Sequence, residues 1–187
     1  MENEIKRCVE KLLSGAVILY PTDTVWGIGC DATNEEAIER IYTIKQRNES
    51  KSMLILLDQA AKIPFYVKRI PLIAWDLIPQ TDRPTTFIYP TAQNLPSKII
   101  PGDGTIAIRV TKNEFCRKLI HTLGRPLIST SANVSGTIAP NTYNEISKEI
   151  ISQMDYVVPE NFADSTDYKP SRIVRFIDDY NFLIIRE

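Results

Sequence analysis

Short, continuously apolar runs alternate along the chain with segments in which apolar residues recur at helical spacing. An apolar run of about four to eight residues is typical of a strand that is covered on both faces of its sheet. Two segments that flank the polar turn 178–181 predict a terminal hairpin. We therefore predict strands at 16–20, 52–57, 85–89, 105–110, 126–128, 156–158, 172–177 and 182–186.

Amphipathic segments predict helices between several of these strands. The Asn113 side chain can cap the first turn of one helix, and Gly124 can end that helix in a left-handed conformation. Residues 33–36 have the form of a capping box for another helix, and Thr142 with Glu145 opens a third in the same way. The predicted helices span 5–13, 37–45, 115–123 and 142–154, with only short helical pieces in the proline-rich part from 58 to 84.

These elements predict an α/β protein with one mixed sheet. Helices and strands interleave without the one-to-one rhythm of a doubly wound fold, and the hairpin-like pairs require antiparallel neighbours. The 187 residues, 43% of them hydrophobic, suit one globular core, and no repeat or linker interrupts them. We therefore expect a single domain over 1–187, built on a twisted sheet of parallel and antiparallel strands.

Composition and charge argue against several classes of protein. The formal net charge of -1 gives no overall signature of polyanion binding, so any phosphate or nucleic-acid site must come from a local cluster of cations. Cys8, Cys30 and Cys116 are far apart and outside CxxC spacing, so neither disulfides nor a protein-bound metal is predicted. Neither a signal-peptide pattern nor an apolar run of roughly 20 residues is present, so we expect a cytoplasmic protein without membrane contact.

Nucleophilic catalysis is not expected either. The one histidine, His121, lies in a predicted helix, where a surface or packing role is the ordinary one. No histidine is close in sequence to Ser129, Ser131 or a cysteine, so the pattern indicates neither a Ser–His nor a Cys–His pair. The chemistry that remains is positioning and charge stabilisation, as in phosphate transfer.

Small polar residues follow two of the apolar runs at the points where the runs end. The segment 22–24 (T-D-T) follows the first run, and the segment 129–133 (S-T-S-A-N) follows a later one. Open α/β sheets bind ligands at the carboxyl ends of their strands, but Asx and Ser/Thr turns use the same residue types. Both interpretations stay open for each segment. Gly27 and Gly29 allow close backbone approach, but they do not complete a dinucleotide or P-loop motif.

Three cations, Lys45, Arg47 and Lys51, lie at the end of a predicted helix. Cations suit the negative end of the helix dipole, so one interpretation is a solvated basic turn. The other is a phosphate clamp, in which arginine supplies a bidentate fork and lysine a point charge. Arg109 favours the clamp, because a cation on a half-buried strand needs an anionic partner.

Four motifs together resemble the YrdC/TsaC family of threonylcarbamoyl-AMP synthases. They are Y-P-T-D-T-V-W-G-I-G-C-D-A at 20–32, K-Q-R-x-x-x-K at 45–51, G-T-I-A-I-R-V at 104–110 and S-T-S-A-N-V-S-G at 129–136. Each motif alone is weak, but the combination spans nearly the whole chain. The resemblance favours the phosphate clamp over the basic turn.

The resemblance implies a YrdC-like fold, in which a twisted open sheet of parallel and antiparallel strands, with flanking helices, surrounds a concave and positively charged cleft. It implies synthesis of L-threonylcarbamoyladenylate from L-threonine, bicarbonate or CO2, and ATP, with release of pyrophosphate. Mg²⁺ would enter with ATP. Other threonylcarbamoyl-transfer proteins would use the product to modify tRNA, and the family's binding of double-stranded RNA makes direct contact with tRNA a further expectation.

The matched motifs imply three groups of site residues. Those implied to bind threonine are Thr22, Arg109, Ser129 and Ser171. Those implied to hold the ATP phosphates and the carboxylated intermediate, and so to serve catalysis, are Lys45, Arg47 and Lys51. Those implied to bind the rest of the nucleotide are Thr105, Ser131, Asn133 and Arg186.

The sequence also departs from the family pattern at several positions. Asn48 stands where the family usually has proline, and Ser52 stands where it usually has proline or glycine. Arg172 replaces a threonine, and the segment 82–85 replaces the usual P-G-P-x-T. Two alternatives to the synthase therefore stay open. One is a YciO-like paralogue with altered activity, and the other is a non-catalytic module that binds double-stranded RNA or tRNA. Retention of Lys45 and Arg47 favours the synthase, and the slightly acidic net charge speaks against the RNA module.

Overall fold

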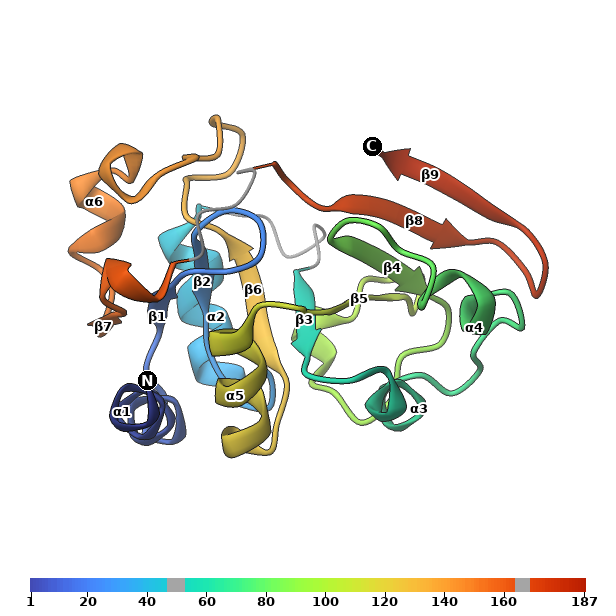
Figure 1. Ribbon diagram of the computed structural model, residues 1–187, viewed down its shortest axis with the longest axis horizontal. Coiled ribbons are helices and arrows are strands. Elements are labelled where there is room, and N and C mark those ends of the chain that lie inside the picture. Colours follow the sequence, from blue (N-terminus) through green and yellow to red (C-terminus); the bar gives the residue numbers. More distant parts are fainter. Residues whose placement is uncertain (47–52, 164–168) are drawn as a thin grey trace.

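The structure is a computed structural model that describes residues 1–46, 53–163 and 169–187 (Figure 1). The helices are α1 (Glu2–Leu13), α2 (Glu35–Ile44), α3 (Ile63–Tyr66), α4 (Ala74–Leu77), α5 (Glu114–Leu123) and α6 (Lys148–Ile151). The strands are β1 (Ile18–Tyr20), β2 (Gly27–Gly29), β3 (Leu54–Leu57), β4 (Thr85–Tyr89), β5 (Ile106–Val110), β6 (Leu127–Ser131), β7 (Tyr156–Val157), β8 (Arg172–Phe176) and β9 (Phe182–Arg186).

The strands of the described residues form one nine-stranded sheet in the order β7-β1-β2-β6-β3-β5-β4-β8-β9. Three neighbouring pairs are parallel, β1 with β7, β3 with β5 and β4 with β8, and the remaining pairs are antiparallel. The prediction of a mixed α/β sheet is therefore confirmed, as is the terminal hairpin, which is β8–β9. The sequence pattern missed β2, because its three residues include two glycines.

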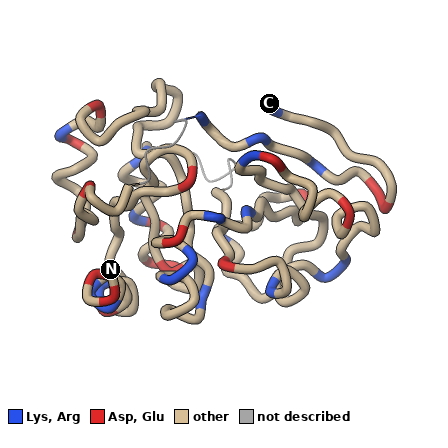
Figure 2. The backbone as a smooth tube through the Cα atoms, viewed as in Figure 1, with Lys and Arg blue, Asp and Glu red and all other residues tan. Residues whose placement is uncertain are grey.

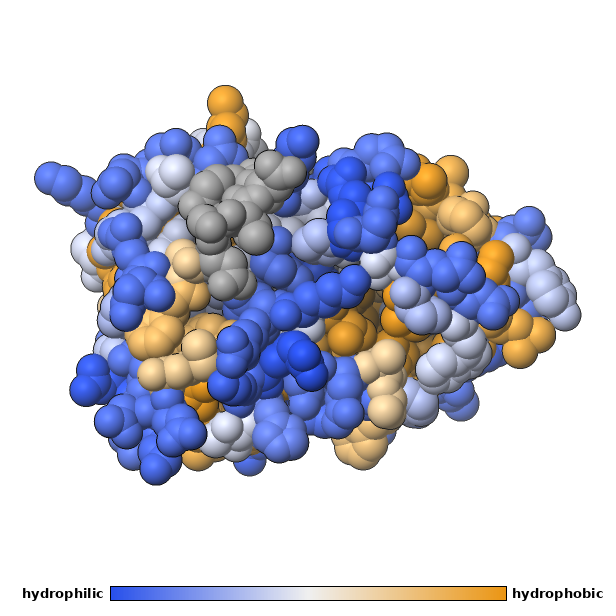
Figure 3. All heavy atoms as spheres, viewed as in Figure 1, coloured by the Kyte–Doolittle hydropathy of each residue, from blue (hydrophilic) through white to orange (hydrophobic). Residues whose placement is uncertain are grey.

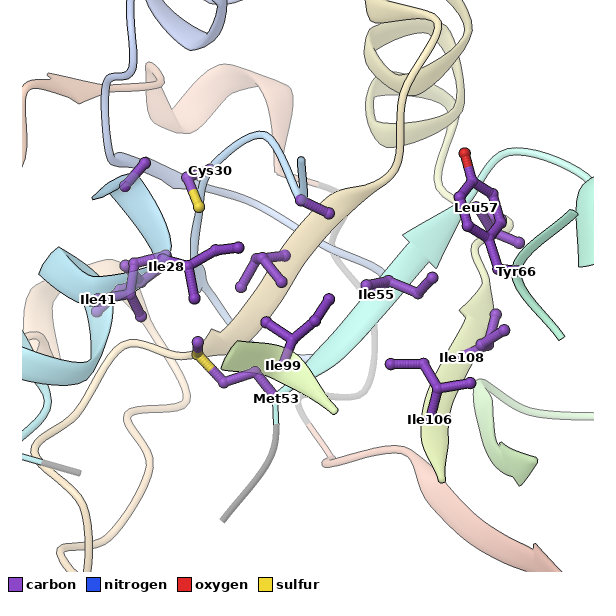
Figure 4. Close-up of a cluster of buried hydrophobic side chains, with 14 of the residues drawn as sticks. Ile28, Cys30, Ile41, Met53, Ile55, Leu57, Tyr66, Ile99, Ile106 and Ile108 are labelled. Atoms are coloured by element: carbon purple, nitrogen blue, oxygen red, sulfur yellow. The ribbon is translucent and has the colours of Figure 1, made fainter. Parts of the chain in front are cut away.

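Helices cover both faces of the β1 side of the sheet, which explains why its strands are continuously apolar. Along β1 and the residue before it, Val17 and Leu19 point into a core with α2, while Ile18 and Tyr20 point into a second core with α1 and α5. Successive side chains of a strand point to opposite faces, so a strand with two covered faces needs apolar residues at every position. Figure 4 shows the α2 core, where Ile28, Ile41, Met53, Ile55, Ile99, Ile106 and Ile108 gather.

The ends of the helices test the predicted caps. The Asn113 side chain accepts from the Cys116 backbone N–H, and Gly124 ends α5 with a φ of 71°, so both predictions for this helix are confirmed. The capping box at 33–36 is wrong, because Asn34 is the cap of α2 and the Thr33 hydroxyl donates to Asp31 instead. Asn34 is the better cap because its side chain is placed to accept from the third residue of the helix.

The helix predicted from 142 is also wrong at its start. Residues Tyr143–Glu145 form one 3-10 turn, and α6 begins only at Lys148, after the cap Ser147. The Glu145 carboxylate accepts from the Asn141 backbone N–H, so this side chain holds the residues just before the turn and does not cap an α-helix.

Close packing of β2 on its neighbours depends on a glycine. A Cβ atom at Gly29 would lie 2.2 Å from the Ile128 carbonyl oxygen and 2.8 Å from the Tyr20 ring. Such distances do not occur between real atoms, so only glycine lets β2 lie between β1 and β6. The predicted close approach is thus confirmed at Gly29. Within the described residues, no helix has the length and apolar character that crossing a membrane requires.

Candidate functional site

A cavity of about 300 Å³ opens over one face of the sheet, where alternate residues of β4 and β5, such as Ala107 and Arg109, line it. Residues of β2, β3, β4, β5, β6, β8 and β9 line it, together with residues 24–26, Met53, Ala139, Pro170 and Ser171. On the face drawn in Figure 3, hydrophilic residues cross the middle, and apolar side chains appear both at the lower left and toward the end that carries β9. Five of the predicted site residues line this one cavity, namely Arg109, Ser129, Ser131, Ser171 and Arg186.

The two polar segments that were predicted from the sequence also come together here. Thr24 from the first segment lines the cavity with Ser129 and Ser131 from the second. The register explains this, because β2 links the two segments by pairing with β1 on one side and with β6 on the other. In β6 the strand continues through Ser131, so its last polar side chains are held by the sheet and not by a turn.

Arg109 is the most deeply buried cation of the cavity wall, with 3% of its surface exposed. Its Nη2 lies 3.2 Å from Asp23 Oδ1, and its Nη1 donates to the Thr24 hydroxyl at 3.1 Å. Asp23 is therefore the anionic partner that the sequence required. The Nε–H of Arg109 is buried and has no hydrogen-bond partner among the described residues, and an unpaired buried donor is unfavourable unless a ligand accepts from it.

Thr22 is buried in the turn that leads to this arginine and is not among the residues that line the cavity. Its hydroxyl donates to the Val25 carbonyl oxygen at 2.7 Å and accepts from the Thr24 backbone N–H at 3.0 Å. These are the contacts of a Ser/Thr turn, which was one of the two interpretations. The contact of Thr22 with threonine stays a prediction.

Ser171 and Arg186 form the opposite wall. The Ser171 hydroxyl is hydrogen-bonded to the Thr86 hydroxyl at 2.8 Å, and its carbonyl oxygen accepts from Nε and Nη2 of Arg186 at 2.9 and 2.8 Å. Partial burial lowers the pKa of Arg186, and repulsion from Arg109 and Arg83 lowers it further. Sequence analysis missed Thr86, because only the pairing of β4 with β8 brings it to Ser171.

Lys45 has an unexpected environment. Only 1% of its surface is exposed, and its ammonium group donates to the Asn133 carbonyl oxygen at 2.7 Å and to the Ser131 carbonyl oxygen. The Lys45 carbonyl oxygen in turn accepts from the Ser135 backbone N–H at 2.9 Å. Lys45 therefore fastens the loop after β6 to the end of α2 and is not itself part of the described cavity wall. Its contact with phosphate stays a prediction.

The other two members of the cation set, Arg47 and Lys51, lie outside the described residues, as do Asn48 and Ser52. Thr105 and Asn133 are described but do not line the cavity. The Thr105 hydroxyl donates to Asp103 at 2.7 Å, and the Asn133 side chain donates to the Thr137 carbonyl oxygen at 2.7 Å. Their nucleotide contacts stay predictions.

Residues that often carry catalysis lie elsewhere in the described part of the chain. His121 is exposed on α5, 3.4 Å from Asp58, as expected for a surface histidine. Burial raises the pKa of the Cys8 thiol to about 12, and Cys30 and Cys116 are buried free thiols as well. No three His, Cys, Asp or Glu side chains of the described residues are grouped so that they can hold a metal ion.

The charges of the cavity wall indicate which ligand it suits. Both charged residues among the described lining residues are arginines, and the other polar side chains carry hydroxyls, apart from the indole N–H of Trp26. Since neither a histidine nor a carboxylate of the described residues lines the wall beside Ser129 and Ser131, no general base is in place to activate these serines. The arrangement can bind and orient an anion that also carries hydroxyl or amine groups.

Comparisons with known proteins agree with this picture. The Sua5/YciO/YrdC family model, described as "Telomere recombination", matches residues 10–187. The chain is 34% identical over 175 residues to a protein named threonylcarbamoyl-AMP synthase from Pseudoalteromonas translucida, and the match covers 92% of each chain.

Solved structures show the same fold. The crystal structure of P. abyssi Sua5 complexed with L-threonine superposes with a TM-score of 0.87 at 24% identity and covers 97% of this chain. This chain spans only 53% of the length of that Sua5 chain. The crystal structure of E. coli YciO superposes with a TM-score of 0.86 at 24% identity, covering 100% of this chain and 90% of the other.

Proposed function

This chain belongs to the Sua5/YciO/YrdC family, and we propose from that premise that it is an L-threonylcarbamoyladenylate synthase. The relatives named threonylcarbamoyl-AMP synthase support an enzyme that makes an AMP-linked product in a nucleotidyl-transfer reaction. The observation that carries the proposal is the cavity in which Arg109, Ser129, Ser131, Ser171 and Arg186 meet. These five residues come from three strands, β5, β6 and β9, and from the position just before β8, yet the resemblance assigned all of them to substrate binding.

The proposed reaction needs three reactants in one place. The amine of L-threonine adds to CO2, or to the carbon of bicarbonate with loss of water, and forms a carbamate. A carbamate oxygen then attacks the α-phosphorus of ATP, the bond to the β-phosphate oxygen breaks, and pyrophosphate leaves. A carbamate is short-lived in water, so proximity and charge stabilisation in a closed pocket supply most of the catalysis.

Different residues of the cavity suit different reactants. In the proposal, the threonine carboxylate accepts from the unpaired Nε–H of Arg109, whose own charge is balanced by Asp23. The hydroxyls of Ser129 and Ser171 line the same cavity and suit the amine and side-chain hydroxyl of the amino acid. Ser131 and Arg186 lie toward the nucleotide, and ATP would arrive as its magnesium complex. The relative from P. abyssi that was crystallised with L-threonine supports the amino-acid part of this scheme.

Two further parts of the proposal concern partners. Other threonylcarbamoyl-transfer proteins would take up the product and pass the group to tRNA. Direct binding of tRNA or other double-stranded RNA is a separate property, which a salt-dependent gel shift with tRNA tests.

Release of pyrophosphate from ATP tests the main proposal. The expected result is release that requires both L-threonine and bicarbonate, together with a product whose mass is that of threonylcarbamoyl-AMP. L-serine and L-valine in place of threonine are the matched controls. Release that ignores threonine or bicarbonate would contradict the synthase and favour a paralogue with altered activity, and tRNA binding without any turnover would favour the RNA-binding module.

A further inference from the structure

A third arginine, Arg83, lies beside this cavity and is not among the residues that line it. Arg83 lines a smaller neighbouring pocket with Pro84 and Thr85, and it reaches the cavity wall through Pro170. Arg83 immediately precedes Pro84 and β4, and its Nη2 is 3.5 Å from the Pro170 carbonyl oxygen. Arg186 donates to the next carbonyl oxygen, that of Ser171, at 2.8 and 2.9 Å. Two guanidinium groups therefore converge on consecutive carbonyl groups of the cavity wall.

The position of Arg83 is set by the sheet. The Arg172 backbone N–H donates to the Pro84 carbonyl oxygen at 3.0 Å, and β4 runs parallel to β8 from Thr85 and Arg172 onward. Proline fixes its own φ and restricts the residue before it, so the backbone of Arg83 is held at the rim. Figure 2 shows Lys and Arg positions meeting where the starts of β4 and β8 approach the end of β5.

The charges at this end are not balanced within the described residues. Asp23 pairs with Arg109, and Asp82 and Glu187 both pair with Arg172, at 3.4 and 3.1 Å. No carboxylate of the described residues pairs with Arg83 or Arg186. The lowered pKa of Arg186, caused by burial and then by Arg109 and Arg83, agrees with like charges that face one another.

Two uncompensated guanidinium groups suit a ligand with at least two negative charges. A carboxylate carries one charge, and Arg109 already offers it a buried donor. A phosphate chain carries several charges and accepts from both arginine forks at once. The contact of Arg83 with Pro170 is long, so a phosphate oxygen can replace it with little loss.

We propose that Arg83 binds the nucleotide's phosphate chain, forming with Arg186 a two-arginine clamp for the part of ATP that leaves as pyrophosphate. The clamp rests on the proposed synthase function for its substrate, but the binding of pyrophosphate itself does not require turnover. Arg83 is a binding residue in this scheme, and loss of its fork should weaken the phosphate contact and leave the threonine contact intact.

The test compares Arg83→Ala and Arg83→Lys with the wild-type protein by calorimetric titration with inorganic pyrophosphate. One lost charge-assisted contact at a partly buried site should raise the Kd for pyrophosphate about 10-fold in Arg83→Ala. Lysine keeps the charge but not the fork, so Arg83→Lys should raise the Kd by only about 3-fold. In the pyrophosphate-release assay, Arg83→Ala should raise the KM for ATP by a similar factor and leave the KM for threonine unchanged.

The matched control is Arg69→Ala, which removes the same charge from an exposed arginine that pairs with Asp179 outside the cavity wall. It should bind pyrophosphate like the wild type. A Kd within twofold of wild type in Arg83→Ala would overturn the clamp, as would failure of the wild type to bind pyrophosphate or a rise in the KM for threonine alone. If Arg83→Ala fails to fold, Arg83→Lys is the test, and a Kd for pyrophosphate equal to that of the wild type would overturn the clamp. Failure of the synthase itself would be recognised separately, as pyrophosphate release that does not depend on threonine.

Discussion

Replacement of Lys45 by methionine tests the role that the structure gives this buried cation. Methionine has a similar length and no charge, so the change removes the ammonium donor and keeps most of the packing. The carbonyl oxygens of Ser131 and Asn133 would each lose a charged donor. The Ser131 carbonyl oxygen keeps the Asn133 backbone N–H as a donor at 2.9 Å, so its loss is the smaller one. A carbonyl left without its partner costs roughly 1–3 kcal/mol, and loss of the second contact at Ser131 adds about 1 kcal/mol.

Part of this loss is offset, because the buried ammonium no longer has to be desolvated. We therefore expect Lys45→Met to lower the free energy of unfolding by about 1–3 kcal/mol. For a chain of this length, that corresponds to a fall in Tm of roughly 2–12 °C. Urea unfolding followed by circular dichroism measures the change, and Lys68→Met, at an exposed lysine, is the control, with an expected effect within about 0.5 kcal/mol.

A Lys45→Met protein as stable as the wild type would refute the view that this ammonium holds the loop after β6. The catalytic assignment makes a second prediction for the same position. Lys45→Ala and Arg47→Ala should each lower turnover at least about 100-fold, measured well below the Tm of each variant, because preorganised charge is lost. Near-normal turnover in both variants would refute the roles assigned to them.

Three further changes test the packing, an ion pair and the thiols. Gly29→Ala should destabilise the protein by about 3 kcal/mol or more in urea unfolding, because its Cβ would meet the Ile128 carbonyl oxygen at 2.2 Å, and an unchanged midpoint would refute the β2–β6 packing. The Arg40 guanidinium holds the pKa of Asp155 below its usual value, so the pair contributes stability above about pH 4 that is lost as the pH falls through the lowered native pKa. Asp155→Asn should therefore lose about 0.5–1 kcal/mol near pH 7, a small value because the pair is partly exposed, and a difference from wild type that persists near pH 2 would contradict this assignment. All three cysteines are buried, and burial followed by the nearby Glu4 raises the pKa of Cys8 to about 12, so the thiols should react with Ellman's reagent only after denaturation, and rapid labelling of the native protein would refute the packing around them.

Local patterns in the sequence determined much of this protein. The helix from Glu114 to Leu123 could be predicted with both of its ends, because a cap and a C-terminal glycine act on the residues next to them. Strands covered on both faces, such as β3, could be found from the sequence. Successive side chains of a strand point to opposite faces, so a strand that is buried on both faces is apolar at every position. The family could be recognised from motifs that are each contiguous in the chain.

Only the tertiary structure decided which of these pieces meet. The pairing of β4 with β8 brings Thr86 to Ser171 and Arg83 to Pro170, although more than 80 residues separate the partners. The sequence predicted that Arg109 needs an anionic partner, but only the fold shows that Asp23 lies next to it. Likewise only the fold shows that the Lys45 ammonium group donates to the Asn133 carbonyl oxygen in the loop after β6, and its predicted contact with phosphate stays a prediction. The physical reason is that caps and apolar periods act over a few residues, whereas strand order and buried polar contacts depend on which distant segments the chain brings together.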